Sequence, residues 1–88
     1  MYTLLDSERV RRWIVVYLAV ISGEDSETID LDSRLSHFDI DSVDAVAMAL
    51  QFETTFNRSI GAEFFLVSEL TIRELAGQIV ANAAGRDV

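Results

Sequence analysis

The chain has 88 residues, half of them apolar, and a formal net charge of −8, with no proline, no cysteine and one histidine, His37. A chain of this length forms one small domain. Without thiolates, and with one imidazole, it cannot build a disulfide framework, a zinc site or a Cys–His dyad. The lack of proline favours helices with short connections over a turn-rich β-sandwich.

The negative charge is concentrated in the middle of the chain. Residues 22–56 hold nine acidic residues and one arginine, which sums to −8, whereas the rest hold six acidic residues and six arginines, which sums to zero. The acidic stretch is either a solubilising surface or a docking surface for basic partner proteins. Both interpretations disfavour nucleic acid as a partner, because its phosphates would be repelled.

The first element is predicted to be an amphipathic helix from Ser7 to Ile21. Asp6 or Ser7 can cap its start, and Ser22-Gly23 ends it. The run from Trp13 to Ile21 is too short to cross a bilayer and the N-terminus carries no basic region, so we expect a cytoplasmic protein. The apolar residues recur at helical spacing: Val10, Trp13, Ile14, Tyr17, Leu18 and Ile21.

Residues 23–40 lose this periodicity and are predicted to form a long polar loop. A loop of this length is unusual in so small a domain unless it has a function. Apolar residues spaced along it are expected to pin it to the core: Leu31, Leu35, Phe38 and Ile40.

The next helix is predicted to run from about Asp41 to Phe56, with Asp41 as its N-cap and Asp44 in its first turn. It carries two apolar stripes. One has both phenylalanines and is expected to lie in the core: Ala45, Met48, Ala49, Phe52 and Phe56. The other is expected to be at least partly exposed, as a small surface for a partner protein: Val43, Val46, Ala47 and Leu50. Burial of both stripes is the alternative.

The C-terminal third is predicted to hold one short and one long helix. Gly61–Val67 suits one or two helical turns, and Thr71 and Glu74 form a T-x-x-E capping box at the start of the last helix, which Gly85 closes. The apolar stripe of that helix is Ile72, Leu75, Ala76, Ile79, Val80 and Ala83. The predicted fold is therefore all-α: one domain over residues 1–88, structured over about 6–84. Three main helices and one short helix pack as a small four-helix bundle, with a long loop between the first two.

Sites for catalysis or metal binding are not predicted. If Asp39 opened a calcium loop, Asp44 would stand where the turn needs glycine and Leu50 where a bidentate glutamate is needed. A hydrolase built on Ser42 and His37 would also need an orienting acid and an oxyanion hole in a pocket that excludes water, and one histidine on a solvent-facing loop is more often a plain surface or core residue. A glycine-rich phosphate loop is also missing.

The stretch from Phe38 to Val46, which contains Asp41-Ser42-Val43, resembles the D-S-[LV] attachment motif of acyl carrier proteins. Other features of that family follow in order. Its acidic loop with spaced leucines and phenylalanines resembles Ile29–Ile40, and its helix ending in phenylalanine before a turn resembles Glu53–Asn57. Its last-helix opening, T-[VI]-x-[DE]-L, matches Thr71–Leu75. A lone D-S-V is weakly specific, but the ordered set covers nearly the whole chain.

The resemblance implies a non-catalytic carrier. A phosphopantetheinyl transferase would attach 4′-phosphopantetheine covalently to the hydroxyl of Ser42, next to Asp41, and the thiol of that arm would carry acyl groups as thioesters. The positive end of the helix would favour the phosphodiester. The resemblance also implies that a short acyl chain can fold back between the helices, lined by Phe52, Phe56, Phe65 and Ile72.

The partners implied by the resemblance are enzymes with basic docking surfaces, such as acyl-loading enzymes and ketosynthases. The residues expected to meet them are Val43, Asp44, Val46, Ala47, Leu50 and Glu53. We expect a monomer with no nucleic-acid, membrane or metal partner.

Three departures distinguish the chain from housekeeping fatty-acid carriers. Asp39 stands where the family usually has glycine, Ala47 and Thr54 stand where those carriers usually have acidic residues, and Gly61–Val67 lacks their common acidic run. These departures favour a discrete carrier for a specialised pathway, such as polyketide or lipopeptide assembly, over the fatty acid synthase.

Two alternatives stay open. An aminoacyl or peptidyl carrier belongs to the same superfamily, although its motif is usually less acidic. A helical protein-interaction module without a prosthetic group would share the charge asymmetry and the exposed stripe.

Overall fold

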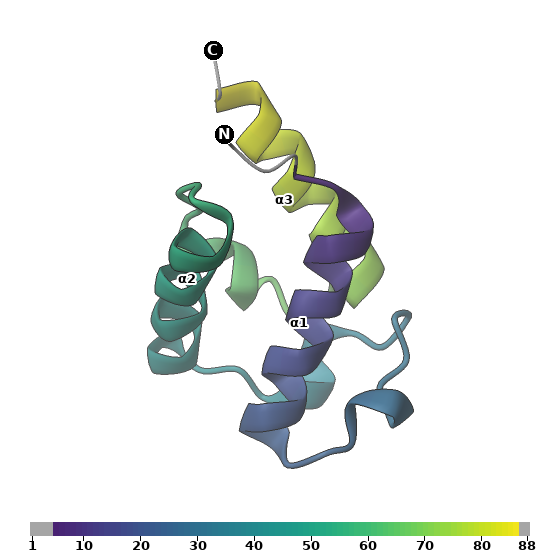
Figure 1. The fold of residues 1–88 in the computed structure, drawn as a ribbon. Helices are drawn as coiled ribbons and strands as arrows, with labels where there is room; N and C mark the ends of the chain where they lie inside the picture. The colour runs from purple at the N-terminus through teal and green to yellow at the C-terminus, as the bar shows by residue number, and fades with distance from the viewer. Residues whose placement is uncertain (1–4, 87–88) are drawn as a thin grey trace.

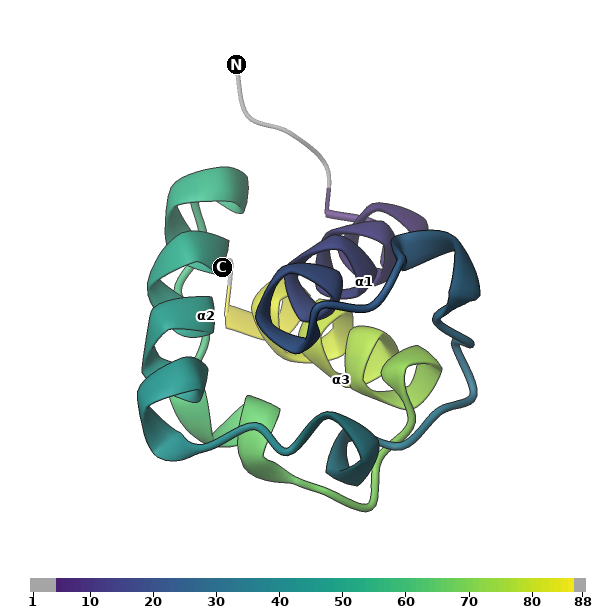
Figure 2. The same cartoon turned by 90° about the horizontal axis from the view of Figure 1, so that it is seen from below.

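The computed structural model describes residues 5–86, with side chains up to residue 82. Three α-helices form its frame: α1 (Ser7–Ser22), α2 (Ser42–Phe56) and α3 (Ile72–Arg86). Three short 3₁₀ helices lie in the connections, namely η1 (Ser26–Thr28), η2 (Leu35–Phe38) and η3 (Ala62–Leu66). Helix α1 packs along α3, whereas α2 stands across from this pair and packs on η3 (Figures 1 and 2). Residues 5–86 contain no strand, so the all-α prediction is confirmed, with η3 as the short helix.

The helix ends are set by local side-chain and backbone bonds. The Asp6 carboxylate accepts from the Arg9 amide at 2.9 Å, and Gly23 ends α1 with φ 80° while its N–H donates to the Ala19 carbonyl. Gly23 suits this position because a left-handed backbone costs a residue without Cβ little. Both predicted boundaries of α1 are confirmed. The predicted end of α3 is wrong, because the helix continues through Gly85 to Arg86.

The core lies between the three helices and under the loop. Trp13 is only partly buried, but its ring contacts Phe52, Phe56 and Phe65 at centroid distances of 5.5, 6.1 and 6.1 Å. Each helix buries one stripe, as its periodicity predicts. The buried residues of the helices are Val10, Ile14, Leu18, Ala45, Met48, Phe52, Phe56, Ile72, Leu75, Ala76 and Ile79.

The segment from residue 23 to 40 is irregular apart from η1 and η2, as predicted. Leu35 and Phe38 are buried, and Leu31 and Ile40 pack against the core, so all four pin the segment as expected. Backbone hydrogen bonds also tie it to the start of α3: the Leu35 amide donates to the Leu70 carbonyl at 2.9 Å, and the Ile72 amide donates to the Ser33 carbonyl at 3.1 Å.

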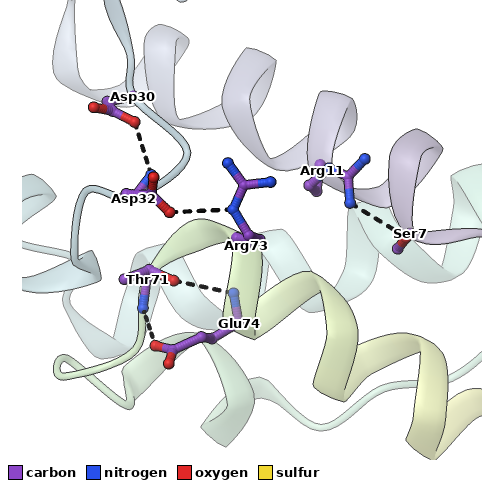
Figure 3. Close-up of polar contacts among 7 residues, drawn as sticks. All are labelled: Ser7, Arg11, Asp30, Asp32, Thr71, Arg73 and Glu74. Atoms are coloured by element: carbon purple, nitrogen blue, oxygen red, sulfur yellow. Dashed lines mark hydrogen bonds and ion pairs between the residues drawn. The ribbon is translucent and has the colours of Figure 1, made fainter.

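Side chains add to this attachment (Figure 3). The Arg73 Nε donates to Asp32 Oδ1 at 3.1 Å, and both of these side chains are exposed. The predicted capping box is present, since the Thr71 amide donates to Glu74 Oε1 at 3.0 Å and the Glu74 amide donates to Thr71 Oγ1 at 3.1 Å. The start of α3 is thus fixed both by its own cap and by the long loop.

A membrane-spanning helix would have to be longer and more apolar than any found among residues 5–86.

Candidate functional site

Ser42 is the first residue of α2 and is exposed. Asp41 precedes it with extended backbone and caps the helix: its Oδ1 accepts from the Asp44 amide at 2.8 Å, and its carbonyl accepts from the Ala45 amide at 2.9 Å. The predicted N-cap is therefore correct. Because the carboxylate and the carbonyl of Asp41 both bond to the first turn of α2, the backbone at Ser42 is held in place while its side chain stays open to solvent.

The electrostatics of this helix start suit a tethered group better than a bound anion. The helix end carries a partial positive charge of about half an elementary charge, which favours a phosphate. The exposed carboxylates of Asp39 and Asp41 and the half-buried one of Asp44 oppose it. A free phosphate would gain little here. A phosphodiester held by a covalent bond to Ser42 would need no such affinity.

Asp39 adopts a left-handed backbone conformation, with φ 54° and ψ 49°. Glycine accepts this conformation without steric cost, and aspartate tolerates it better than most residues do. The conformation gives a physical reason for the glycine that acyl carriers usually have here. Asp39 keeps the backbone turn of the motif and adds a carboxylate beside the start of α2.

An open-mouthed pocket lies beside this turn, with a volume of about 170 Å³. We refer to it as the η2–η3 pocket. Its lining residues come from η2, the turn before α2, and η3 with the residues after it: Leu35, Ser36, Asp39, Ile40, Phe65, Leu66 and Ser68.

The four predicted lining residues lie mainly in the core. Phe52, Phe65 and Ile72 have no exposed surface, and Phe56 has 6%. Phe65 lines the η2–η3 pocket, whereas Phe56 lines a separate groove of about 610 Å³ near the end of α2, together with Trp13. The four therefore serve first as packing residues of the core.

The second stripe of α2 is exposed, as predicted. Val43 is 75% exposed, Val46 51% and Leu50 60%. Among the other predicted docking residues, Asp44 and Ala47 are half-buried, and exposed Glu53 accepts from the Ser59 hydroxyl at 3.2 Å. Exposed apolar residues outside the prediction are Leu66 and Val67 near η3, and Val16 and Val20 on α1.

The signal for the extra exposed residues was present in the sequence. Leu66 and Val67 follow two phenylalanines in a segment too short to bury four large side chains in a row. Val16 and Val20 fall outside the periodic stripe of the first helix. Both pairs could have been identified by asking which apolar residues the helical period leaves out.

The family comparison agrees with this geometry. Residues 12–79 match the family described as phosphopantetheine attachment site, and this range contains the whole helix start with Asp41 and Ser42. The chain belongs to the phosphopantetheine-attachment family. The predicted resemblance is thereby confirmed, as is the predicted prosthetic group, because members of this family carry 4′-phosphopantetheine covalently on a serine.

A solved structure shares the fold. The HMG-ACPI domain from the CurA module of Lyngbya majuscula, determined by NMR, superposes with a TM-score of 0.71 at 17% sequence identity. The match covers all of this chain and 88% of that domain. No curated protein matches the chain as a relative.

The residues present fit the prosthetic group that the phosphopantetheine-attachment family carries. The group, when bound, supplies a thiol on a long flexible arm that can hold cargo as a thioester. For such an attachment Ser42 would offer an exposed hydroxyl at a capped helix start, beside the turn at Asp39.

Proposed function

We propose that this chain is an acyl carrier whose Ser42 hydroxyl is the attachment point of 4′-phosphopantetheine. The observation that supports it most is the combination of an exposed Ser42 with the Asp41 cap at the start of α2, inside the matched range. Other serines in the matched range lie elsewhere, such as Ser36 on η2 and Ser59 beyond α2. Neither of these begins a long helix.

Under this proposal the chain catalyses no step of its own. A phosphopantetheinyl transferase directs the Ser42 oxygen to the phosphorus of coenzyme A that bears the pantetheine. A serine–phosphate ester forms, the pyrophosphate bond breaks, adenosine 3′,5′-bisphosphate leaves, and the serine proton passes to a base of the transferase. The carrier only positions and exposes the Ser42 hydroxyl. A chain with one histidine and no cysteine can do this, because the transferase supplies the catalytic groups.

The proposed partners are acyl-loading and acyl-transferring enzymes that meet the exposed stripe of α2. The enzyme would make apolar contacts with Val43, Val46 and Leu50. Its basic residues would pair with Asp44 and Glu53. The chain would act as a monomer in the cytoplasm and in a specialised pathway such as polyketide or lipopeptide assembly, which the departures at Asp39, Ala47 and Thr54 favour.

The test is the intact mass after incubation with coenzyme A and a broad-specificity phosphopantetheinyl transferase. We expect the wild-type chain to gain one phosphopantetheine and Ser42→Ala to gain none. Ser36→Ala is a matched control, since Ser36 is also exposed and lines the η2–η3 pocket. This variant should load like wild type. Loading of Ser42→Ala would place the attachment on another serine.

An aminoacyl carrier is the second candidate, because the match to the phosphopantetheine-attachment family does not by itself distinguish the cargo. The acidity of residues 22–56 favours acyl cargo. Charging the loaded protein with adenylating enzymes for fatty acids and for amino acids would separate the two, and faster transfer of an amino acid would favour the alternative.

A further inference from the structure

A groove far from Ser42 lies between the first half of α1 and the end of α2, at the same end of the bundle (Figure 1). We refer to it as the α1–α2 groove, and its volume is about 610 Å³. Ser42 and Phe56 are the first and last of the 15 residues of α2, which at about 1.5 Å a residue puts them roughly 20 Å apart. The residues that line the groove are Glu8, Arg9, Arg12, Trp13, Val16, Thr55 and Phe56.

The groove has the composition of a protein-binding surface. Its floor is apolar and aromatic, since the partly buried Trp13 ring packs on Phe56 at a centroid distance of 6.1 Å and Val16 is 51% exposed. Tryptophan and arginine are enriched among the residues that dominate binding energy at interfaces. Val20, one turn further along the same face of α1, is 76% exposed and extends the apolar strip. This strip of α1 is therefore open to a partner.

The charge of the groove is opposite to that of the acidic middle of the chain. Arg9 and Arg12 outnumber Glu8 among its lining residues, whereas residues 22–56 carry −8. The Arg12 guanidinium lies 3.8 Å from the Glu8 carboxylate, and the two side chains are 77% and 74% exposed. An exposed ion pair of this kind is weak, so a carboxylate of a partner can compete with Glu8 for Arg12.

We propose that the α1–α2 groove binds an amphipathic helix of a partner protein, one with apolar residues on one face and acidic residues beside them. Such a helix anchors its apolar residues, at steps of three and four, in the groove, and its carboxylates reach Arg9 and Arg12. A basic segment would be repelled by these arginines and drawn to residues 22–56 instead. The acidic middle of the chain likewise disfavours an anionic membrane surface as the occupant.

The position of the groove lets this partner stay bound while other enzymes work at the start of α2. The docking residues proposed above end at Glu53, and none of them lines the groove. The opposite charges of the two surfaces direct basic enzymes to one and the acidic helix to the other. The groove thus tethers the carrier to a particular partner, independently of the prosthetic group.

The experiment titrates the full chain with two synthetic peptides of about 15 residues, long enough to form a helix. Both carry leucine on one face; one carries glutamate on the other face, and its match carries lysine. Neither contains tryptophan, so fluorescence reports Trp13, the only tryptophan of the chain. We expect the glutamate peptide to shift the Trp13 emission to shorter wavelength with a saturable isotherm, and the lysine peptide to leave it unchanged. Equal responses to both peptides, or no saturable response, would overturn the proposal.

Amide chemical shifts locate the bound peptide. The glutamate peptide should shift the amides of Arg9, Trp13 and Phe56 and leave those of Val43 and Leu50 unchanged. Shifts confined to Val43 and Leu50 would place the binding on the other surface and contradict the proposal. Shifts of the groove amides on concentrating the chain without peptide would make a second copy of the chain the occupant, which would also overturn it.

Charge-matched variants test the role of the arginines. Arg12→Glu and Arg34→Glu change the net charge equally, and both arginines are exposed, but only Arg12 lines the groove. Arg12→Glu should weaken binding of the glutamate peptide about tenfold or more and allow the lysine peptide to bind. Arg34→Glu should behave as wild type. Identical affinities of the two variants would show that the charge of the groove does not select the partner.

The outcome is separable from the proposed function of Ser42. Ser42→Ala should bind the glutamate peptide as wild type does, and saturating peptide should leave the rate of phosphopantetheine loading unchanged. A peptide that blocks loading would place its site at the start of α2 and refute the groove. If wild type binds the peptide but is never loaded, the carrier function fails and this inference stands.

Discussion

The ring of Trp13 on α1 meets the ring of Phe52 on α2 edge to face, with centroids 5.5 Å apart and planes inclined by 79°. Helix α1 otherwise packs mainly on α3, and α2 packs mainly on η3. The contact between these two rings therefore joins the two parts of the bundle. Phe56 on α2 and Phe65 on η3 extend the cluster, so Trp13 connects α1 to three aromatic rings in the other part of the bundle.

Phe52→Ala should destabilise the protein by about 3–5 kcal/mol, because it removes a fully buried ring and leaves a cavity beneath Trp13. This is a large part of the roughly 5–15 kcal/mol available to a small domain. Urea unfolding followed by tryptophan fluorescence measures it. Leu50→Ala is the control on the same helix: Leu50 is 60% exposed, so its loss should change stability by less than about 0.5 kcal/mol. Equal midpoints for the two variants would contradict the assignment of the two faces of α2.

Leu50→Glu should leave the fold intact but reduce kcat/KM of the phosphopantetheinyl transferase by about five- to thirtyfold, the effect of losing an interface residue worth 1–2 kcal/mol. The measurement combines a thermal melt with the loading rate. Val20→Glu on α1 is the matched control, since Val20 is 76% exposed but lies outside the α2 stripe. Equal loading by both variants would place the docking surface elsewhere.

Asp41→Ala should cost about 1 kcal/mol, because the Asp44 amide loses its acceptor at the start of α2. Loading of Ser42 should also slow, since the helix start that positions the hydroxyl would fray. Asp41→Asn retains a capping oxygen and should restore most of the stability. If Asp41→Ala and Asp41→Asn unfold at the same urea concentration, the cap does not stabilise the site.

Asp39→Gly should be at least as stable as wild type, and Asp39→Val less stable by about 1–2 kcal/mol, because a β-branched residue is strained at φ 54°. Chemical unfolding of the three proteins compares them directly. At Glu27, whose φ is not positive, the ranking should be reversed, with glycine the poorer substitute. The same ranking at both positions would argue against strain at Asp39.

The helix boundaries could be predicted where the signal is local. Asp6, Asp41 and the Thr71–Glu74 pair cap their helices with side chains that lie within three residues of the bonded amide. The end of α3 could not, because Gly85 is a stop signal only when the chain beyond it leaves the helix. The helix ends that depend only on residues close in sequence could therefore be predicted.

The pocket beside Ser42 could not be predicted, because it depends on contacts between distant segments. Asp39 was noted as a departure from glycine, but only the backbone conformation connects that substitution to a turn and to the pocket wall. The resemblance to acyl carriers implied that Phe52 and Ile72 would be among the residues lining the cargo. The fold fills their surroundings instead, and opens its space between η2 and η3.

The backbone bonds between the long loop and the start of α3 have a consequence for local unfolding. Leu35 and Leu70 are bonded across 35 positions of sequence (70 − 35), and Arg73 donates its amide to the Leu31 carbonyl at 3.0 Å, so the loop cannot detach without releasing the first turn of the last helix. The two segments should therefore open as one cooperative unit, and the amides of Leu35 and Ile72 should exchange with deuterium at similar, slow rates. In thermodynamic terms this irregular stretch belongs to the last helix. An enzyme that displaces the loop to reach the arm would therefore also have to open the first turn of α3.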